Sequence, residues 1–139
     1  RRIAFCRWRR KSGAEYLIAM AKIRIKNLLL RTYIGFNPEE LVYKQDVIIN
    51  IEIEADIPEK AIAEDEPLDI VDYKTITKKV IAHVQDGRFK LLEVLTKNIL
   101  DLVFDDRKVK WARVQVDKPH ALRFAESVSV EMEAARDQR

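Results

Sequence analysis

Four polar residues, of types that transfer protons or bind polar ligands, stand at the ends of predicted elements. They are Glu40, Tyr73, Glu93 and Lys118. Taken one at a time, each also fits an ordinary structural role, because charged side chains are mostly exposed. Glu93 fits that role least well, since it lies inside the apolar segment LLEVL, where a buried carboxylate would need hydrogen-bond donors. These four residues are therefore the candidates for a functional site.

The sequence contains few of the motifs that are typical of metal-dependent, phosphate-binding or nucleophilic active sites. The two histidines, His83 and His120, do not stand at metal-ligand spacing from each other or from a cysteine. His83 falls within a predicted helix, which favours a hydrogen-bonded structural role. Cys6 is the single cysteine, so we expect neither an internal disulfide nor a thiolate-built metal centre. The sequence has no glycine-rich phosphate loop and no nucleophile elbow. The expected site contains no metal and no cofactor.

The positive charge of the chain is concentrated at its N-terminus. The 139 residues carry a formal charge of +3 at pH 7, which taken alone suggests a polyanionic partner. Residues 1–19 carry a net +5, so residues 20–139 carry −2. We interpret residues 1–19 as a basic N-terminal extension, non-native or disordered, ahead of a domain at 20–139 that starts at Met20. A transit peptide and a nucleic-acid-binding arm stay open as alternatives.

The composition is that of a single domain, because 139 residues that are 47% hydrophobic can build one ordinary core. No segment approaches the roughly 20 apolar residues that a membrane-spanning helix needs. One cysteine fits a reducing, cytoplasmic setting. We expect neither a membrane nor nucleic acid as a partner.

From residue 22 onward, the hydrophobic pattern predicts the element order β-β-α-α-β-β. Alternation predicts strands over residues 22–34, 45–56, 109–118 and 126–133. Helical spacing predicts a helix that Asp72 caps and Gly87 ends, and a second helix over residues 91–103. The acidic segment 58–69 contains two prolines and is expected to be a surface connection with a short helical turn.

This order indicates an α+β fold, an antiparallel sheet with two helices on one face. Such a sheet has two unpaired edges, which proteins usually cover or pair. Two helices are too few to cover both edges. We therefore expect copies of the chain to pair their edges into an oligomeric barrel.

Nearly the whole chain from residue 20 to 132 resembles the dihydroneopterin aldolase family. The segments that carry the resemblance, in order, are IRIKNLLLRTYIG, EELVYKQDVIINI, DYKTITKKVIAHV, GRFKLLEVLTKNILDL and VDKPHALRFAESVSV. The resemblance implies the tunnelling fold, in which four subunits close their sheets into a barrel and two rings stack into an octamer. It also implies pterin sites at subunit interfaces.

The resemblance further implies how the pterin ring is bound. Glu93 would be the anchor, because one carboxylate can accept hydrogen bonds from the adjacent N–H and amino groups of the pterin edge. Backbone groups near Leu92 and Val71 would complete the recognition of the ring.

Lys118 and Tyr73 would be the proton-transfer pair, and Glu40 would order the catalytic water or the hydroxyls of the substrate's side chain. The implied chemistry is a retro-aldol step, in which the C1′–C2′ bond breaks and the dihydropterin ring takes up the electrons. The ring is its own electron sink, so the reaction needs neither a Schiff base nor a metal.

Within the family, the sequence is most similar to the members that epimerise C2′ of dihydroneopterin triphosphate. His120 and Arg123, with Lys74, are cations close in sequence to the catalytic candidates, and arginine suits a phosphate tail. Arg123 could instead pair with Glu126. The alternatives are an aldolase that releases glycolaldehyde and a non-catalytic pterin-binding protein.

Overall fold

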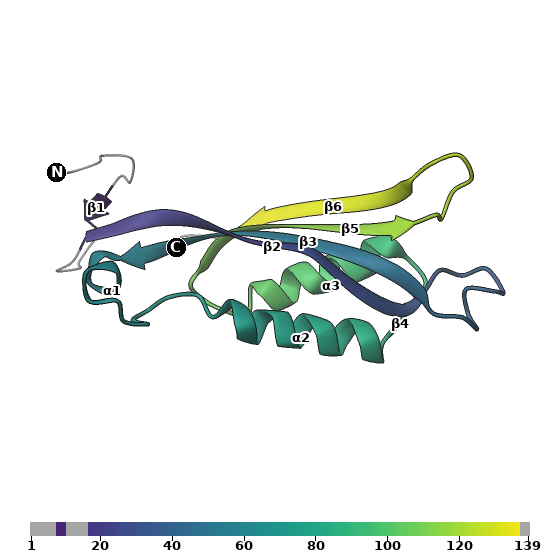
Figure 1. Cartoon of the computed structure of the whole chain (residues 1–139), viewed down its shortest axis with the longest axis horizontal. Coiled ribbons are helices and arrows are strands. Elements are labelled where there is room, and N and C mark those ends of the chain that lie inside the picture. Colours follow the sequence, from purple (N-terminus) through teal and green to yellow (C-terminus); the bar gives the residue numbers. More distant parts are fainter. Residues whose placement is uncertain (1–7, 11–16, 137–139) are drawn as a thin grey trace.

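The structure, a computed structural model, describes residues 8–10 and 17–136 (Figure 1). Its elements in chain order are β1 (Trp8–Arg10), β2 (Leu17–Ile34), β3 (Gln45–Pro58), α1 (Glu59–Glu64), α2 (Tyr73–Asp86), β4 (Arg88–Phe89), α3 (Leu92–Val103), β5 (Val109–Pro119) and β6 (Ser127–Ala135). The predicted β-β-α-α-β-β order is confirmed by β2, β3, α2, α3, β5 and β6. The short helical turn expected in the acidic connection is α1.

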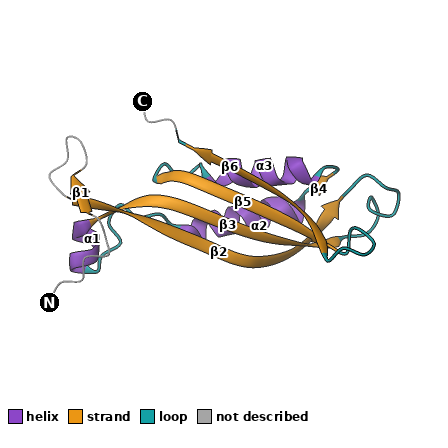
Figure 2. Cartoon of the chain, turned by 90° about the horizontal axis from the view of Figure 1, so that it is seen from above, coloured by secondary structure: helices purple, strands orange, loops and turns teal. Residues whose placement is uncertain are grey.

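The main strands form one antiparallel sheet in the order β1-β2-β3-β5-β6, and the short β4 pairs in parallel with the end of β2. Figure 2 shows β2 and β6 at opposite edges, with the helices beneath the sheet. Both long helices lie on the same face, as Figure 1 shows, and the other face stays open within one chain. The fold is thus the expected two-layer α+β arrangement.

The core lies between the sheet and the two long helices. Val47, Ile49 and Ile53 of β3 are fully buried, and their period of two turns one face of the strand toward the helices. The residues of α2 and α3 at helical spacing, among them Val80 and Leu95, are also fully buried. This explains why the hydrophobic pattern alone predicted these elements correctly.

The helix α2 begins and ends at the residues that the sequence indicated. The Asp72 carboxylate accepts hydrogen bonds of 3.1 Å from the backbone N–H groups of Lys74 and Thr75, which satisfies two donors of the first turn. Gly87 follows the last turn. Inside the core, the Thr32 hydroxyl donates to the carbonyl of Val84 at 2.6 Å and ties β2 to the end of α2.

The first long strand starts earlier than predicted. It begins at Leu17, ahead of Met20, and Ile18 and Ala19 are buried. Three residues of β1 pair with residues 17–19. The interpretation of residues 1–19 as a non-native or disordered extension stays a prediction for the rest of that segment, since residues 1–7, including Cys6, and 11–16 lie outside the described part.

Chain direction decides which side chains can meet. Strand β2 ends, β3 begins, β5 ends and α3 begins at the same end of the sheet, the right-hand end in Figure 1. We call this the loop end of the molecule.

In the described residues, no helix is long and apolar enough to cross a membrane.

Candidate active site

Two of the predicted residues, Glu40 and Lys118, form an ion pair at the loop end. Lys118 is near the end of β5, and strand alternation turns it to the same face as the buried Val114 and Val116. Glu40 lies in the tight turn between β2 and β3, where its N–H donates to the carbonyl of Asn37 at 2.9 Å. The side chains of Lys118 and Glu40 are only 12% and 18% exposed. The fold therefore brings together two charges that are 78 residues apart in sequence.

Gln45, which was not among the residues predicted from the sequence, positions the carboxylate of this pair. Its amide nitrogen donates to Glu40 Oε2 at 3.1 Å and to the carbonyl of Ile34 at 2.8 Å. The backbone N–H of Asn37 donates to Glu40 Oε1 at 3.3 Å. The alternating pattern of β3 could have indicated a role for Gln45, because this polar residue begins the strand on the same face as the buried Val47.

These contacts stabilise the ionised form of Glu40. The pKa of its carboxyl lies below the ordinary 4.5, first because Lys118 donates to it and then because Gln45 and the backbone of Asn37 also donate. Partial burial opposes this shift and is outweighed. At neutral pH the loop end therefore holds a carboxylate bound to an ammonium group.

The stability of the fold should report this pair through its pH dependence. Because the pKa of Glu40 is lower in the folded state, its stabilising contribution is complete above the ordinary value of about 4.5 and is lost as the pH falls through the folded value. We expect urea unfolding to show that Glu40→Gln lowers the free energy of unfolding at pH 7, and that the deficit shrinks below about pH 4.5. Glu39→Gln, an exposed neighbour, is the control. A deficit that does not change with pH would contradict the assigned ion pair.

Gly35 makes room for the Glu40 carboxylate. Its φ of +123° is in the region that side chains disfavour, and a Cβ built there would overlap the carboxylate of Glu40. Its N–H donates to the carbonyl of Phe89 at 2.8 Å, which fixes the backbone at this position.

Replacing Gly35 by alanine should therefore displace Glu40. We expect Gly35→Ala to lose more than about 1 kcal/mol of unfolding free energy and to lower turnover, because the carboxylate must leave its place beside Lys118. The measurements are chemical denaturation and steady-state kinetics. Glu39→Ala, in the same turn, should keep near wild-type stability and turnover. Unchanged values for Gly35→Ala would show that the carboxylate needs no such space.

Glu93 and Leu92 lie in the first turn of α3, also at the loop end. Leu92 is buried and Glu93 is exposed. No side chain within the described chain caps this helix, so backbone N–H groups of the first turn have no side-chain acceptor. The site at this position offers a carboxylate together with backbone donors to a polar ring. Because Glu93 is exposed, its carboxylate does not need the hydrogen-bond donors that a buried carboxylate at this position would need.

His120 and Arg123 lie in the loop that joins β5 to β6, just beyond Lys118. Both are exposed, and the N–H of His120 donates to the carbonyl of Glu126 at 3.1 Å. Arg123 stacks over the fully exposed ring of Phe124, with 5.5 Å between the guanidinium carbon and the ring centroid. Within the described residues, no ion pair joins Arg123 to Glu126, so the alternative role for Arg123 is not observed.

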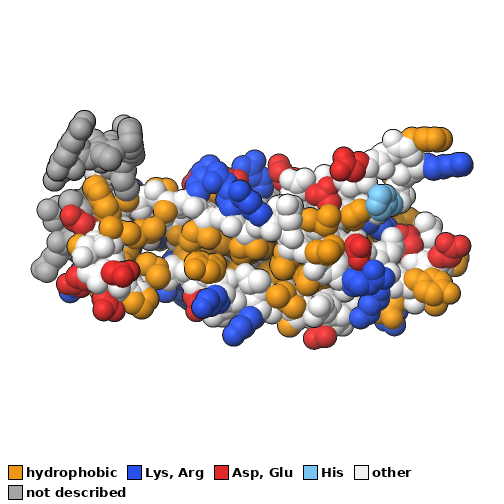
Figure 3. Space-filling view, viewed as in Figure 1, with side chains coloured by type: hydrophobic (Ala, Val, Ile, Leu, Met, Phe, Trp, Pro, Cys, Tyr) orange, Lys and Arg blue, Asp and Glu red, His pale blue; other side chains and the backbone are white. Residues whose placement is uncertain are grey.

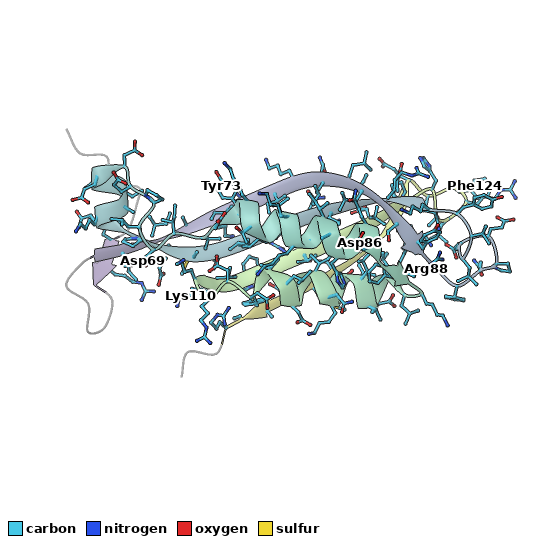
Figure 4. The ribbon with its side chains drawn as sticks, turned by 90° about the horizontal axis from the view of Figure 1, so that it is seen from below. Asp69, Tyr73, Asp86, Arg88, Lys110 and Phe124 are labelled. Carbon is cyan, nitrogen blue, oxygen red and sulfur yellow. The ribbon has the colours of Figure 1, made fainter. Side chains whose placement is uncertain are left out.

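Tyr73 and Val71 lie far from the other candidates. Tyr73 is the first residue of α2, is 52% exposed, and Figure 4 shows it well separated from Arg88 and Phe124 at the loop end. The 14 residues of α2 span about 20 Å, so one chain cannot bring Tyr73 to Lys118. Tyr73 and the buried Val71 line an open, mostly apolar hollow of about 440 Å³ beside α1.

The remaining candidate groups are structural. The Asn98 side-chain nitrogen lies 3.2 Å from His83 Nε2, and His83 packs against Phe89 with ring centroids 5.4 Å apart. This confirms the hydrogen-bonded role predicted for His83. Over residues 8–10 and 17–136, no group of three or more His, Cys, Asp or Glu side chains is placed to hold a metal ion.

The described site thus has two parts at opposite ends of α2. One is the charged pair Glu40–Lys118 at the loop end, where the first turn of α3 also offers the Glu93 carboxylate and backbone donors. The other is an apolar hollow with a phenol at its rim. A ligand that needs both parts must lie between two copies of the chain.

Comparison with known proteins shows the family to which the chain belongs. The family described as "FolB: Dihydroneopterin aldolase" matches residues 23–133. A dihydroneopterin triphosphate 2′-epimerase of Pseudomonas aeruginosa is 50% identical over 117 residues, 84% of this chain and 94% of that protein. Its counterpart in Escherichia coli is 46% identical over 110 residues, 79% of this chain and 91% of that protein.

A crystal structure of Escherichia coli dihydroneopterin aldolase in complex with neopterin superposes with a TM-score of 0.77 at 29% identity. It covers 83% of this chain and 99% of the aldolase. The fold and the sequence thus lead to the same conclusion: the chain belongs to the FolB dihydroneopterin aldolase family.

Proposed function

We propose that this protein is a dihydroneopterin triphosphate 2′-epimerase, which inverts C2′ of the substrate's side chain. The observation that carries the proposal is the enclosed Glu40–Lys118 pair, in a chain half identical to a protein of that name. An aldolase that releases glycolaldehyde is the second candidate, because the family description and the neopterin-bound Escherichia coli neighbour both name an aldolase.

The proposed site is completed by a second copy of the chain. Glu93 binds the pterin edge through paired hydrogen bonds, with backbone groups near Leu92 beside it. Tyr73 and the backbone near Val71 come from the neighbouring copy, because they lie at the opposite end of α2. We propose the octamer of two stacked rings as the assembly that provides these interfaces.

The proposed reaction is a retro-aldol step followed by its reversal on the other face. The 2′-hydroxyl gives up its proton, the C1′–C2′ bond breaks, and its electron pair enters the C6=N5 imine of the ring. The released aldehyde stays bound and turns. Addition to its opposite face then re-forms the C1′–C2′ bond and returns the proton to oxygen. An aldolase would instead protonate the shared enamine intermediate and release the aldehyde.

In this proposal, Tyr73 and Lys118 handle the proton of the 2′-hydroxyl. The phenol oxygen of Tyr73 takes this proton, and the positive charge of Lys118 stabilises the negative charge that develops on oxygen. Glu40 holds Lys118 in place through the ion pair and orders the hydroxyls of the substrate's side chain. The electrons end in the ring, so the proposed reaction proceeds without a metal.

Chromatographic identification of the products from dihydroneopterin triphosphate is the deciding experiment. We expect the 2′-epimer, dihydromonapterin triphosphate, with the same yield when a chelator is present. Release of 6-hydroxymethyl-7,8-dihydropterin would identify the aldolase. Binding of the pterin without turnover would identify a non-catalytic binding protein.

Arg123 is proposed to bind the triphosphate tail together with His120. We expect Arg123→Ala to raise KM for the triphosphate by about tenfold, since charge-assisted hydrogen bonds to phosphate are strong, and to leave KM for unphosphorylated dihydroneopterin almost unchanged. Steady-state kinetics with both substrates measures this. Arg107→Ala, at the opposite end of β5, is the matched control. Equal effects of Arg123→Ala on both substrates would remove Arg123 from phosphate binding.

A further inference from the structure

The loop that joins β5 to β6 contains two backbone positions that side chains disfavour. His120 has a φ of +60° and Phe124 a φ of +69°, and a positive φ is a true outlier for a bulky aromatic residue. The base of the loop is held by the bond from the His120 N–H to the Glu126 carbonyl and by the Ser127 hydroxyl, which donates to Asp117 Oδ2 at 2.8 Å. Strained backbone persists where the surrounding structure fixes it, and it clusters at functional sites. The conformation of this loop is therefore the feature to explain.

This conformation presents an aromatic ring and a guanidinium group to solvent at the loop end. Phe124 is fully exposed, so its ring adds nothing to the core. Figure 4 shows Phe124 at the far tip of the molecule, and Figure 3 shows hydrophobic and Lys or Arg side chains where this loop projects. Arg123 stacks on this ring at a distance typical of cation–π contacts. Among the described residues, no carboxylate forms an ion pair with Arg123. The loop thus offers a guanidinium that a ring positions and no carboxylate neutralises.

The position of the bond that breaks decides which fragment carries the phosphates. In dihydroneopterin triphosphate, the proposed substrate, the triphosphate is an ester of C3′, the terminal carbon of the side chain. Breaking the C1′–C2′ bond therefore leaves all three phosphates on the aldehyde, which is glycolaldehyde triphosphate. The pterin fragment is held through its ring, whereas the aldehyde has little else than its phosphates by which a protein can hold it. Charge-assisted hydrogen bonds from arginine to phosphate are strong and orienting.

We propose that the β5–β6 loop decides between epimerisation and cleavage by holding the aldehyde through its phosphates, with Arg123 as the binding residue and Phe124 as the positioning residue. The inference rests on the proposed function and extends it to the step at which the two candidate activities diverge. Aldehyde that stays bound adds back to C1′ and gives the epimer. When the aldehyde leaves, the enamine takes a proton at C1′, which balances the proton lost from the 2′-hydroxyl. The product is then 6-hydroxymethyl-7,8-dihydropterin.

A comparison of two substrates is the first test of this inference. The measured quantity is the ratio of the cleavage product, 6-hydroxymethyl-7,8-dihydropterin, to the 2′-epimer, separated by chromatography at early times before the epimers equilibrate. We expect the wild type to give a ratio at least about tenfold higher from dihydroneopterin than from its triphosphate, because the unphosphorylated aldehyde lacks the hydrogen bonds to a charged group. Equal ratios from the two substrates would overturn the inference.

Substitutions in the loop are the second test, with the same ratio measured from the triphosphate. We expect Arg123→Ala to raise the ratio by about tenfold, and Phe124→Leu to raise it by about threefold, since a cation–π contact at an exposed site is weak. Phe124→Tyr keeps an aromatic face and should give the wild-type ratio. None of these variants should change the ratio from unphosphorylated dihydroneopterin. The controls are Leu122→Ala, an exposed neighbour in the same loop, and Arg107→Ala at the opposite end of β5, and both should behave like the wild type.

Calorimetric titration with inorganic triphosphate measures phosphate binding without any chemistry. We expect Arg123→Ala to raise the Kd of inorganic triphosphate by about tenfold and Phe124→Leu to raise it by about threefold. Equal Kd values for the wild type and Arg123→Ala would overturn the role of the loop. If the wild type forms the epimer and the loop variants keep its product ratio, this inference fails and the proposed function stands. A wild type that forms no epimer from the triphosphate would overturn both.

Discussion

Lys118→Ala is expected to slow turnover of dihydroneopterin triphosphate by at least about 10²-fold, the usual contribution of a proton-transfer residue. Lys118 is enclosed beside Glu40 at the end of β5, and its removal leaves the site without the cation that would stabilise the negative charge developing on oxygen. Single-turnover kinetics with saturating substrate measures the chemical step.

Lys110→Ala, at the other end of β5, is the matched control and should retain wild-type turnover. The loss of Lys118 also leaves the Glu40 carboxylate unpaired, which is costly for a partly buried charge. Lys118→Ala should therefore also lower the free energy of unfolding, and turnover is compared at a temperature where both proteins are folded. Wild-type turnover by folded Lys118→Ala would refute the role of this residue.

Tyr73→Phe should slow turnover to a similar degree, by at least about 10²-fold, with little loss of pterin binding. The phenol oxygen is the only atom removed, and the ring that lines the apolar hollow is kept. Fluorescence titration gives the Kd of the pterin, and steady-state kinetics gives turnover. Near wild-type turnover would exclude Tyr73 from proton transfer.

Mixing the two variants tests whether Tyr73 and Lys118 act across an interface. In a mixed assembly of Tyr73→Phe and Lys118→Ala chains, about a quarter of the proposed interfaces combine an intact Lys118 with an intact Tyr73 of the neighbouring copy. After the two variants are refolded together, we expect turnover to rise toward about a quarter of the wild-type value. Two variants that stay inactive together, although they co-assemble, would place both residues in the site of a single chain.

The elements of the fold follow closely from local patterns. The period of two in β3 and the helical spacing in α2 and α3 predicted which faces are buried, and Asp72 predicted the start of α2. These features depend on neighbours a few residues apart, so a single sequence contains the information. The start of β2 was placed too late because Met20 and the basic charge of the preceding segment suggested a boundary inside a continuous strand.

The candidate residues were named from the sequence and its family resemblance, yet their arrangement was not predictable from it. Gln45 and Gly35 were missed, because the role of each depends on where the Glu40 carboxylate lies. The individual roles of Glu93, His120 and Arg123 stay predictions, because the structure places all three at the loop end and position alone does not assign a role.

The sequence by itself determined the alternation of the strands, the helix ends and the family, all of which rest on local pattern or on the order of segments along the chain. Only the tertiary structure decided that Glu40 meets Lys118 from 78 residues away and that Tyr73 lies a helix length from both. The physical reason is that strand register and the direction of each connection bring distant residues together or keep them apart, and neither is visible in any short segment.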